Sequence, residues 1–424
     1  MAEFDILERG LWVDYDPKNR YYNSRWNTLD EVKSKLTLPK TVSITDSTLR
    51  EGEEAPFVVF TTEEKLKIAR MLEEIGVHEI DCGFAAINEH HFEFLQALKK
   101  EGLRIKKSVI VRIDLPKCES GIERVLQAGA DIILCGLYAT PIKDYSLEDY
   151  LALITRAIGY CKDRQVFTAF WGTCTRWEKK FVESVYKTAI DAGADRIKIA
   201  GGGVLTVPAF GYLSKMLKTI AGPKELGIHA HNHYGLATAY ALAGVEAGAE
   251  NVETSVNGLG DGAGLAPFEE VVMALTAFYG FDLGINMEKI MELSRLVQRL
   301  SGVGVQPYKP LVGNNVFVET PDTHIEAVLR KRLQGKPSRN YINPEAIGQR
   351  QTILFGPSAL GGPAIELKAM EMGIRLTKAQ VNKVLGFLKK RLATKSSISE
   401  EEVEKIVEKM GQAKTPKTGP PRLH

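Results

Sequence analysis

The chain has 424 residues, of which 44% are hydrophobic and 25% are charged, so it is long and apolar enough to bury a large core. Its 55 basic residues nearly match its 53 acidic ones, and the formal charge of +2 gives no reason to expect a nucleic acid or an anionic membrane as a partner. No apolar run approaches the ~20 residues that a membrane-spanning helix needs, and the N-terminus lacks a signal peptide's charged start and apolar middle.

The cysteines indicate a reducing compartment. They are odd in number, and no two of them lie close together in the sequence: Cys82, Cys118, Cys135, Cys161 and Cys174. This pattern argues against a disulfide framework and against a zinc ribbon. We therefore expect free, mostly buried thiols and a cytoplasmic protein.

Residues 1–38 are predicted to form an N-terminal extension that packs against the following domain or against a second subunit. They contain several large aromatic residues, too many for a disordered tail: Trp12, Tyr15, Tyr21, Tyr22 and Trp26.

One pattern recurs between residues 39 and 280: a segment of helical periodicity, then a glycine, then a short run rich in Val, Ile and Leu. The clearest copies run over residues 73–83, 126–136, 190–200 and 245–255. Gly76, Gly129, Gly193 and Gly248 are predicted helix C-caps, because glycine accepts the left-handed conformation that ends a helix. The residues after them are predicted strands.

Further buried strands are predicted between these copies, at residues 41–47, 106–113, 165–171 and 226–230. Strands that alternate with helices eight times over ~240 residues predict a closed (β/α)8 TIM barrel. An open, doubly wound parallel sheet is the alternative.

Residues 281–410 are predicted to form a linker and a mostly helical C-terminal appendage. Gly, Pro and Asn cluster in residues 301–315, whereas residues 364–410 carry apolar side chains three and four apart, which is typical of amphipathic helices. Residues 411–424 contain Pro and Lys without a hydrophobic face, and we expect them to be disordered.

The active site of a TIM barrel lies at the C-terminal ends of its strands. Two segments there carry metal-ligating residue types: "DSTLREGEE" (residues 46–54) and "HAHNHYG" (residues 229–235). His229 and His231 lie two apart in a strand, so they point the same way and could bind one divalent ion together with a carboxylate from the first segment. Two histidines packed in the core are the alternative. His233 lies past the strand and is expected behind the ligands or facing a substrate.

These motifs resemble those of a metal-dependent barrel family that includes homocitrate synthase, 2-isopropylmalate synthase, citramalate synthase, hydroxymethylglutaryl-CoA lyase and the 4-hydroxy-2-oxovalerate aldolases. "DSTLREGEE" is similar to the family's Asp-(Ser/Thr)-Thr-Leu-Arg-(Asp/Glu)-Gly-Glu-Gln signature, and "HAHNHYGLA" to His-x-His-Asn-Asp-x-Gly-x-Ala. "SVNGLGDGAG" (residues 255–264) is similar to the glycine-rich segment after the eighth strand. "FVETPDTHIEAVL" (317–329) and "NYINPEAIGQRQTILFGPSALGG" (340–362) resemble segments of the condensing members, and details of the first motif lean toward homocitrate synthase.

The resemblance implies that Glu51, His229 and His231 bind a divalent metal ion, which could be Mg, Mn, Zn or Co. It implies that Arg50 stabilises an enolate oxygen. It also implies that His324 and Tyr341 form an acid/base pair that reaches the active site of the other subunit in a homodimer. From the residues alone, His324 could instead be a residue of a surface helix.

Several substrate-handling positions depart from the family pattern. Gly201 and Gly202 stand where an Asp-Thr pair is usual, and that Thr binds the acceptor's carboxylate. Gly172 replaces a glutamate, Glu54 a glutamine, and His233 an aspartate. The resemblance therefore implies intact metal and enolate chemistry with a rebuilt acceptor pocket, in which Gly202 and His233 are candidate substrate-binding positions.

Asp81 and Arg112, at the ends of the second and third predicted strands, are further candidates for binding the substrate's acid group or for ordering Arg50. The leading hypothesis is an acyltransferase that condenses acetyl-CoA, or a related acyl-CoA, with a small carbonyl compound. A carbon–carbon lyase or aldolase with the same site is the second hypothesis, and a barrel that binds a metabolite without turnover is the third.

Overall fold

The computed structural model describes residues 13–18, 20–115, 117–138, 145–336, 340–356, 361–394 and 397–411. The chain divides into two compact units. The larger unit is Ser24–Val305, and the smaller one combines the residues up to Asn23 with those from Gln306 onward. Disorder was predicted for residues 411–424; Gly411 is the last residue of a helix, and residues 412–424 lie outside the described residues. Trp12 also lies outside them.

The larger unit is a closed parallel barrel in the order β10-β3-β4-β5-β6-β7-β8-β9. Its strands are β3 (Ser43–Asp46), β4 (Glu79–Asp81), β5 (Lys106–Arg112), β6 (Ile132–Leu137), β7 (Phe167–Gly172), β8 (Arg196–Gly201), β9 (Glu225–Ala230) and β10 (Asn251–Thr254). Each predicted strand is present, so the TIM-barrel prediction is confirmed and the open-sheet alternative is wrong. The barrel closes where β10 pairs in parallel with β3, which places Thr254 opposite Asp46.

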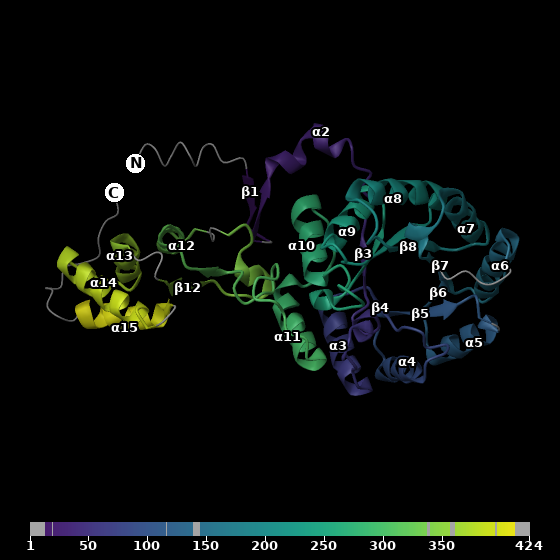
Figure 1. Cartoon of the computed structure of the whole chain (residues 1–424), viewed down its shortest axis with the longest axis horizontal. Coiled ribbons are helices and arrows are strands. Elements are labelled where there is room, and N and C mark those ends of the chain that lie inside the picture. Colours follow the sequence, from purple (N-terminus) through teal and green to yellow (C-terminus); the bar gives the residue numbers. More distant parts are fainter. Residues whose placement is uncertain are drawn as a thin grey trace. The chain divides into compact units, whose positions relative to one another are not determined.

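A helix follows each barrel strand, and Figure 1 shows these helices arranged around the strands. They are α3 (Thr62–Ile75), α4 (Glu89–Glu101), α5 (Cys118–Ala128), α6 (Leu147–Asp163), α7 (Lys179–Asp191), α8 (Val207–Ala221), α9 (Ala237–Glu246) and α10 (Phe268–Tyr279). Helix α11 (Ile290–Ser301) completes the unit. Short 3-10 turns interrupt three of the connections near the C-terminal ends of the strands: η2 (Glu51–Glu54), η3 (Cys174–Arg176) and η4 (Val256–Gly258).

The predicted glycines end their helices with a positive φ. Gly76 is the C-cap of α3 with φ +100°, and Gly129 is the C-cap of α5 with φ +103°. In α7 and α9 an alanine is the C-cap, and Gly193 and Gly248 follow it with φ +102° and +107°. The prediction is therefore correct for two caps and one residue off for the other two.

Residues before the barrel contribute to both units. In the smaller unit β1 (Val13–Asp16) pairs with β2 (Tyr21–Ser24), and the Tyr22 N–H donates to the carbonyl oxygen of Tyr341 at 2.7 Å. In the larger unit η1 (Arg25–Thr28) and α2 (Asp30–Lys33) precede a hydrogen bond from the Thr37 N–H to the carbonyl oxygen of Glu246, at 2.8 Å. The N-terminal extension thus packs on its own chain, including residues more than 300 positions away that the sequence did not predict as neighbours.

The smaller unit has a helical core, as predicted. Its helices are α12 (Asp322–Leu333), α13 (Gly362–Glu371), α14 (Lys378–Leu392) and α15 (Glu400–Gly411). Buried side chains of these helices, such as Ile325, Ile365 and Val384, pack together in one apolar cluster. The sequence did not predict the small sheet beside them, formed by β11 (Val318–Glu319), β12 (Thr352–Phe355) and β13 (Ile398–Ser399).

All five cysteines are free and buried, as the sequence predicted. Among the helices of the described residues, none is both long and apolar enough to cross a membrane.

Gly76 offers a test of the helix ends, because a Cβ there would lie 2.5 Å from the carbonyl oxygen of Gly284. Gly102, the C-cap of α4, also has a positive φ (+71°), but a Cβ there would meet nothing within 4 Å. We expect Gly76→Ala to lower the free energy of unfolding by about 2–4 kcal/mol and Gly102→Ala by only about 1 kcal/mol. Urea denaturation of both variants measures this, and equal losses would show that the close approach to Gly284 is unimportant.

Candidate functional site

A cavity of about 340 Å³ opens at the C-terminal ends of the barrel strands. Its wall combines charged and imidazole side chains with aromatic rings and a run of glycines. The residues that line it are Arg50, Glu51, Glu54, Tyr138, Trp171, Thr173, Thr175, Arg176, Ala200, Gly201, Gly202, Gly203, Val204, His229, His231, His233 and Asp261. Both motifs that the sequence analysis singled out therefore contribute to one cavity.

Glu51, His229 and His231, here called the metal triad, converge on one point of this cavity. Each offers a ligand atom, and these atoms lie within 4.8 Å of one another. His229 Nε2 lies 3.2 Å from His231 Nε2 and 3.8 Å from Glu51 Oε2. Among the described residues, no other group of His, Cys, Asp and Glu could hold a metal ion in this way.

The triad fits a divalent cation chemically. Glu253 Oε1 lies 2.8 Å from His229 Nδ1, so this nitrogen donates its proton to the carboxylate and Nε2 presents a lone pair. Burial lowers the pKa of His231 to about 4, so the His231 ring is neutral at pH 7. His231 Nδ1 is buried and has no hydrogen-bond partner among the described residues. Neutral imidazoles with outward lone pairs beside a carboxylate form a common donor set for divalent metals.

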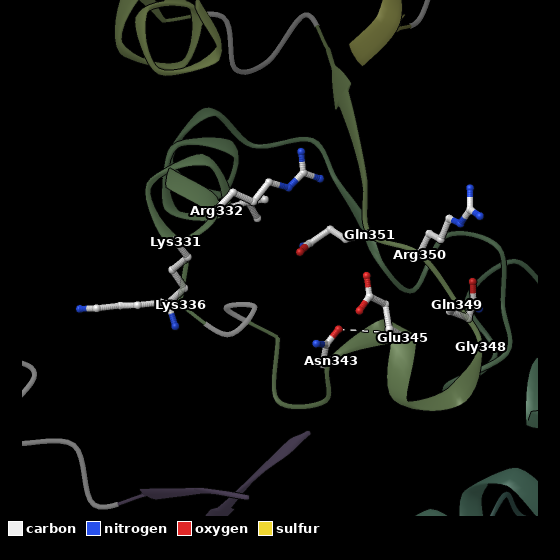
Figure 2. A pocket seen from close by; sticks show the side chains of 10 residues that line it. Lys331, Arg332, Lys336, Asn343, Glu345, Gly348, Gln349, Arg350 and Gln351 are labelled. Carbon is white, nitrogen blue, oxygen red and sulfur yellow. Dashed lines mark hydrogen bonds between the residues drawn. The ribbon is translucent and has the colours of Figure 1, made fainter. Parts of the chain in front are cut away.

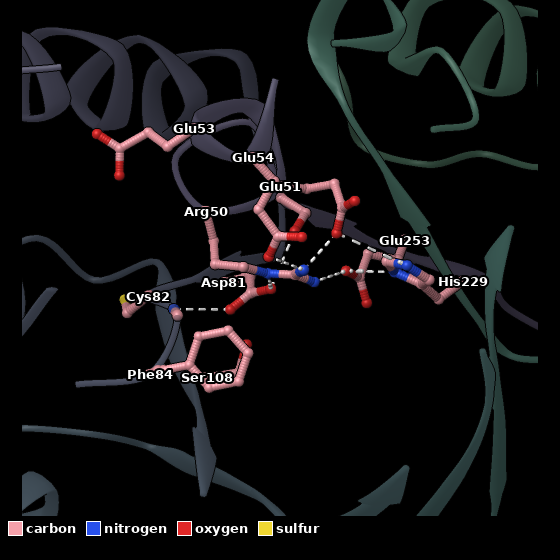
Figure 3. A network of polar contacts seen from close by, with 12 residues as sticks. Arg50, Glu51, Glu53, Glu54, Asp81, Cys82, Phe84, Ser108, His229 and Glu253 are labelled. Atoms are coloured by element: carbon pink, nitrogen blue, oxygen red, sulfur yellow. Dashed lines mark hydrogen bonds and ion pairs between the residues drawn. The ribbon is translucent and has the colours of Figure 1, made fainter. Parts of the chain in front are cut away.

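Arg50 lies at the centre of a buried network of carboxylates, shown in Figure 3. Its Nε donates to Asp81 at 2.7 Å, and its terminal nitrogens contact Glu51, Glu54 (3.1 Å) and Glu253 (3.2 Å). Burial alone would lower the pKa of Arg50, but these carboxylates outweigh burial and raise it well above its usual range. The guanidinium is therefore a permanent positive charge held in one orientation at the edge of the cavity.

The strand register explains why Glu253 belongs to this network. Residue 253 in β10 is paired with His229 in β9 and with Thr45 in β3, so its side chain lies between the two motifs. Lys198 of β8 also binds Glu253, with 2.6 Å between Nζ and Oε2. Burial would raise the pKa of Glu253, but Lys198 and His229 outweigh it and hold the pKa well below the usual range.

Glu53 anchors the turn η2 that carries Glu51. Its carboxylate accepts hydrogen bonds from the buried Lys65 of α3 at 2.6 Å and from the Phe60 N–H at 2.9 Å, and His91 Nε2 lies 3.5 Å away. Burial would raise the pKa of Glu53, but the bonds to His91 and Lys65 outweigh it and lower the pKa to about 2. The turn is thus tied to the first helix of the barrel by a buried ion pair.

Of the other site residues predicted in the barrel, three belong to the site and one does not line the cavity. Asp81 binds and orders Arg50, and Gly202 and His233 line the cavity. Arg112 is absent from the cavity lining: it pairs with Asp114, and its guanidinium lies over the Tyr138 ring at 4.8 Å. Arg112 therefore packs against Tyr138, a residue of the cavity wall, and does not face the cavity itself.

His324 and Tyr341 belong to the smaller unit. His324 lies in α12, as one alternative held, and its Nδ1 is 3.0 Å from Glu319 Oε2, a contact that orients the ring. The His324 side chain is 43% exposed and Tyr341 is 83% exposed, so both side chains are accessible from outside the chain.

Sequence reasoning missed Glu253, Lys198, Tyr138, Trp171 and Arg176. Glu253 and Lys198 lie within barrel strands and outside the cavity lining, and their contacts with the motifs depend on the register between strands, which the sequence does not show. Trp171 lies in β7, whereas Tyr138 and Arg176 lie in the short connections after β6 and β7, where no periodic pattern marks them.

The smaller unit contains a larger cavity of about 620 Å³, which side chains of α12 and of the segment before β12 surround (Figure 2). Its charged lining residues are Lys331, Arg332, Lys336, Glu345 and Arg350. This cavity is lined by one acid and no histidine, so it offers no metal site of the kind found in the barrel. We therefore assign the candidate active site to the cavity of the barrel, although it is the smaller of the two.

The fold and the site together define a TIM-barrel enzyme with a candidate metal centre at its catalytic rim. The sequence model of the HMGL-like family matches residues 41–297, which is the entire barrel, and the chain belongs to this family.

Relatives extend the similarity beyond the barrel. The chain is 37% identical over 357 residues to a probable 2-isopropylmalate synthase of Methanopyrus kandleri, covering 82% of this chain and 69% of that protein. It is 32% identical over 397 residues to the homocitrate synthase AksA of Methanocaldococcus jannaschii, covering 92% and 95% of the two chains. Hydroxymethylglutaryl-CoA lyase from Pseudomonas aeruginosa shares the fold, with a TM-score of 0.55 at 18% identity over 63% of this chain and 95% of that one.

The ion pair of Glu53 predicts an acid-dependent loss of stability. Because the pKa is lower in the folded state (about 2) than its ordinary value of 4.5, the pair contributes its full stability above about pH 4.5 and loses it as the pH falls toward 2. We expect Glu53→Gln to cost about 1–3 kcal/mol at pH 7 and to flatten the acid-dependent loss. Urea titrations from pH 7 down to about pH 3 measure both effects.

Glu63→Gln is the matched control, since the Glu63 side chain is 62% exposed and approaches Arg70 only at 3.8 Å. This variant should keep the stability of the wild type within about 0.5 kcal/mol. If both variants behaved alike, the Glu53 pair would not anchor the turn.

Proposed function

We propose that the protein is a divalent-metal-dependent acyltransferase that condenses acetyl-CoA with a 2-oxo acid and then hydrolyses the product thioester. The observation that carries this proposal is the metal triad beside the buried Arg50 in one cavity. Relatives named homocitrate synthase and 2-isopropylmalate synthase, which align with most of the chain, support the acyl-transferring class.

The chemistry follows from the charges of the site. A bound divalent cation would supply a Lewis acid that polarises the acceptor's carbonyl group. Removing a proton from the thioester's methyl group places negative charge on the thioester oxygen, and Arg50 is a fixed cation at the cavity edge that stabilises it. The new carbon–carbon bond joins that methyl carbon to the acceptor's carbonyl carbon, and water then releases the CoA thiol.

The proton acceptor in this proposal comes from the smaller unit. His324 is oriented by Glu319, as expected for a general base, and Tyr341 can relay the proton. We propose that this pair serves the barrel of a second copy of the chain, in a homodimer.

Exposed apolar side chains around the rim of the barrel support the proposal that a second copy of the chain covers the cavity. Phe57 is 103% exposed with φ +68°, and Val59, Ile87, Val204 and Tyr234 are 76%, 59%, 63% and 76% exposed. They lie on connections that follow β3, β4, β8 and β9, at the end where the cavity opens. Apolar groups gathered at the mouth of a polar site favour a protein partner over water. The buried free cysteines support a cytoplasmic location.

Two histidine variants separate metal binding from condensation. His229→Ala removes a triad member, so we expect the affinity for Mn²⁺ to fall at least about tenfold and acceptor-dependent release of CoA thiol to fall at least about a hundredfold. His324→Ala should retain the affinity for Mn²⁺ and still lose thiol release by about 10²–10⁴-fold. Calorimetric titration of the metal and a thiol assay with acetyl-CoA and a panel of 2-oxo acids make the two measurements.

The same assays separate the proposal from its alternatives. Cleavage of hydroxy acids without any condensation would favour a carbon–carbon lyase. If the wild type bound no divalent metal, the metal-dependent mechanism would be wrong for either direction.

Mixing two inactive variants tests the exchange of catalytic residues between subunits. In a mixed dimer of His229→Ala and His324→Ala, one of the two sites combines an intact barrel with an intact His324. Random reassociation should therefore restore about a quarter of the wild-type activity. A mixture of His324→Ala and Tyr341→Phe should stay at the low level of its components, because every site then lacks one member of the pair. Failure of the first mixture after verified exchange would place the whole site within one chain.

A further inference from the structure

We infer that Arg176, with the hydroxyl groups of Thr173 and Thr175, binds the carboxylate of the acceptor, and that this acceptor is a 2-oxo acid with a single carboxylate and an apolar side chain. The inference rests on the proposed function, because it takes the ligand of this cavity to be the 2-oxo acid acceptor of the condensation. It deepens that proposal, since it names which residues of the cavity wall bind the acceptor.

The charges of the cavity single out Arg176. Two arginines line the cavity, and Arg50 is held by four carboxylates of the protein and is assigned to the thioester oxygen in the proposed function. Arg176 is exposed on the turn η3, and it forms no ion pair with any residue that the structure describes. It is thus the cation of the cavity wall that remains available for a ligand's carboxylate. A guanidinium binds such a group through two parallel hydrogen bonds.

Hydroxyl groups lie on the same short segment. Thr173 Oγ1 is shielded from solvent and has no hydrogen-bond partner among the described residues, although Thr173 lines the cavity. A buried hydroxyl without a partner costs free energy, and a ligand oxygen that accepts its proton removes that cost. Thr175 also lines the cavity, next to Arg176.

Glycines at the ends of β7 and β8 leave space for this segment. Gly201 has φ +122°, and a Cβ there would lie 2.5 Å from Thr175 Oγ1. Gly172, at the end of β7, is covered by the ring of Trp177, and a Cβ there would lie 2.9 Å from that ring. Side chains at these two positions would displace the segment, so the glycines allow residues 173–177 to occupy the wall in their place.

Part of the wall of the cavity is apolar. Tyr138 and Trp171 line the cavity with their ring centroids 4.9 Å apart. Trp171 continues into a buried cluster that includes Ile110, Leu134 and Ala200. An apolar side chain of the acceptor can pack on these rings, whereas a second carboxylate there would lose its water without gaining a cation.

The remaining charges also argue against a dicarboxylate. Glu54 and Asp261 line the same cavity and would repel a second negative charge. A single carboxylate on Arg176 matches the one available guanidinium. The cavity therefore favours 2-oxoisovalerate over 2-oxoglutarate, two probes that differ in the presence of a second carboxylate.

Direct binding to the Mn²⁺-loaded protein tests this inference without turnover. By calorimetric titration, the wild type should bind 2-oxoisovalerate at least about tenfold more tightly than 2-oxoglutarate. Arg176→Gln should weaken the binding of 2-oxoisovalerate about 10- to 100-fold, and Thr175→Val about 2- to 10-fold, with the affinity for Mn²⁺ unchanged. In the thiol assay, Arg176→Gln should raise the KM of the acceptor by the same factor and leave the KM of acetyl-CoA unchanged.

Arg299→Gln on α11 is the matched control, because Arg299 is exposed and lies outside the cavity lining. Equal binding of 2-oxoisovalerate by the Arg176 variant and the wild type would overturn the inference, as would tighter binding of 2-oxoglutarate or no binding of either acid. Binding as expected without thiol release would support the inference and contradict the proposed condensation. Thiol release with an unchanged acceptor KM in Arg176→Gln would support the proposed condensation and contradict the inference about Arg176.

Discussion

The buried guanidinium of Arg50 is the interaction on which the rest of the site depends. It neutralises carboxylates from three places in the barrel: the turn η2, the end of β4 and the middle of β10. Without that cation, these carboxylates would repel one another in a region of low water content, where unpaired charges are costly. The same network orients Glu253, which in turn holds His229 in the tautomer that a metal ligand needs. Arg50 thus holds the metal triad in its geometry, and in the proposed function it also supplies the positive charge that stabilises an enolate oxygen.

Closure of the barrel brings these groups together. The two motifs are separated by about 180 residues in the chain, yet β10 pairs with β3 on one side and with β9 on the other. The register places residue 253 beside both His229 and Thr45, so a single side chain contacts both motifs. An open sheet would leave β3 and β9 apart, and Glu51 could not approach His231. The fold is therefore a precondition of the triad, and the motifs alone are insufficient for it.

The sequence predicted the features that local patterns encode. Repeated glycines after helical segments predicted the barrel, and the alternation of side chains along a strand predicted that His229 and His231 point the same way. It could not predict Glu253, whose role depends on the register between strands, or Arg176, which lies in a turn without periodicity. The sheet of the smaller unit was missed because β11 and β13 have only two residues each, too short for any alternation to show. Long-range pairing and short irregular segments are thus where sequence reasoning ended.

Two parts of the cavity wall are held in place by different kinds of contact. The triad and Arg50 come from β9 and from the turn after β3, whose side chains are tied together by buried ion pairs, so a change at one position disturbs the others. Another part of the wall consists of Gly201, Gly202, Gly203 and the turn η3, and the contacts that a Cβ would make at these glycines are steric. A Cβ at Gly202 would lie 3.0 Å from the Tyr240 ring, and one at Gly203 would lie 3.0 Å from His233. Rings and hydroxyls from neighbouring segments thus occupy the space that side chains at these positions would take. Because each connection of a TIM barrel is a separate segment, a change in η3 can alter this part of the wall without altering the metal centre.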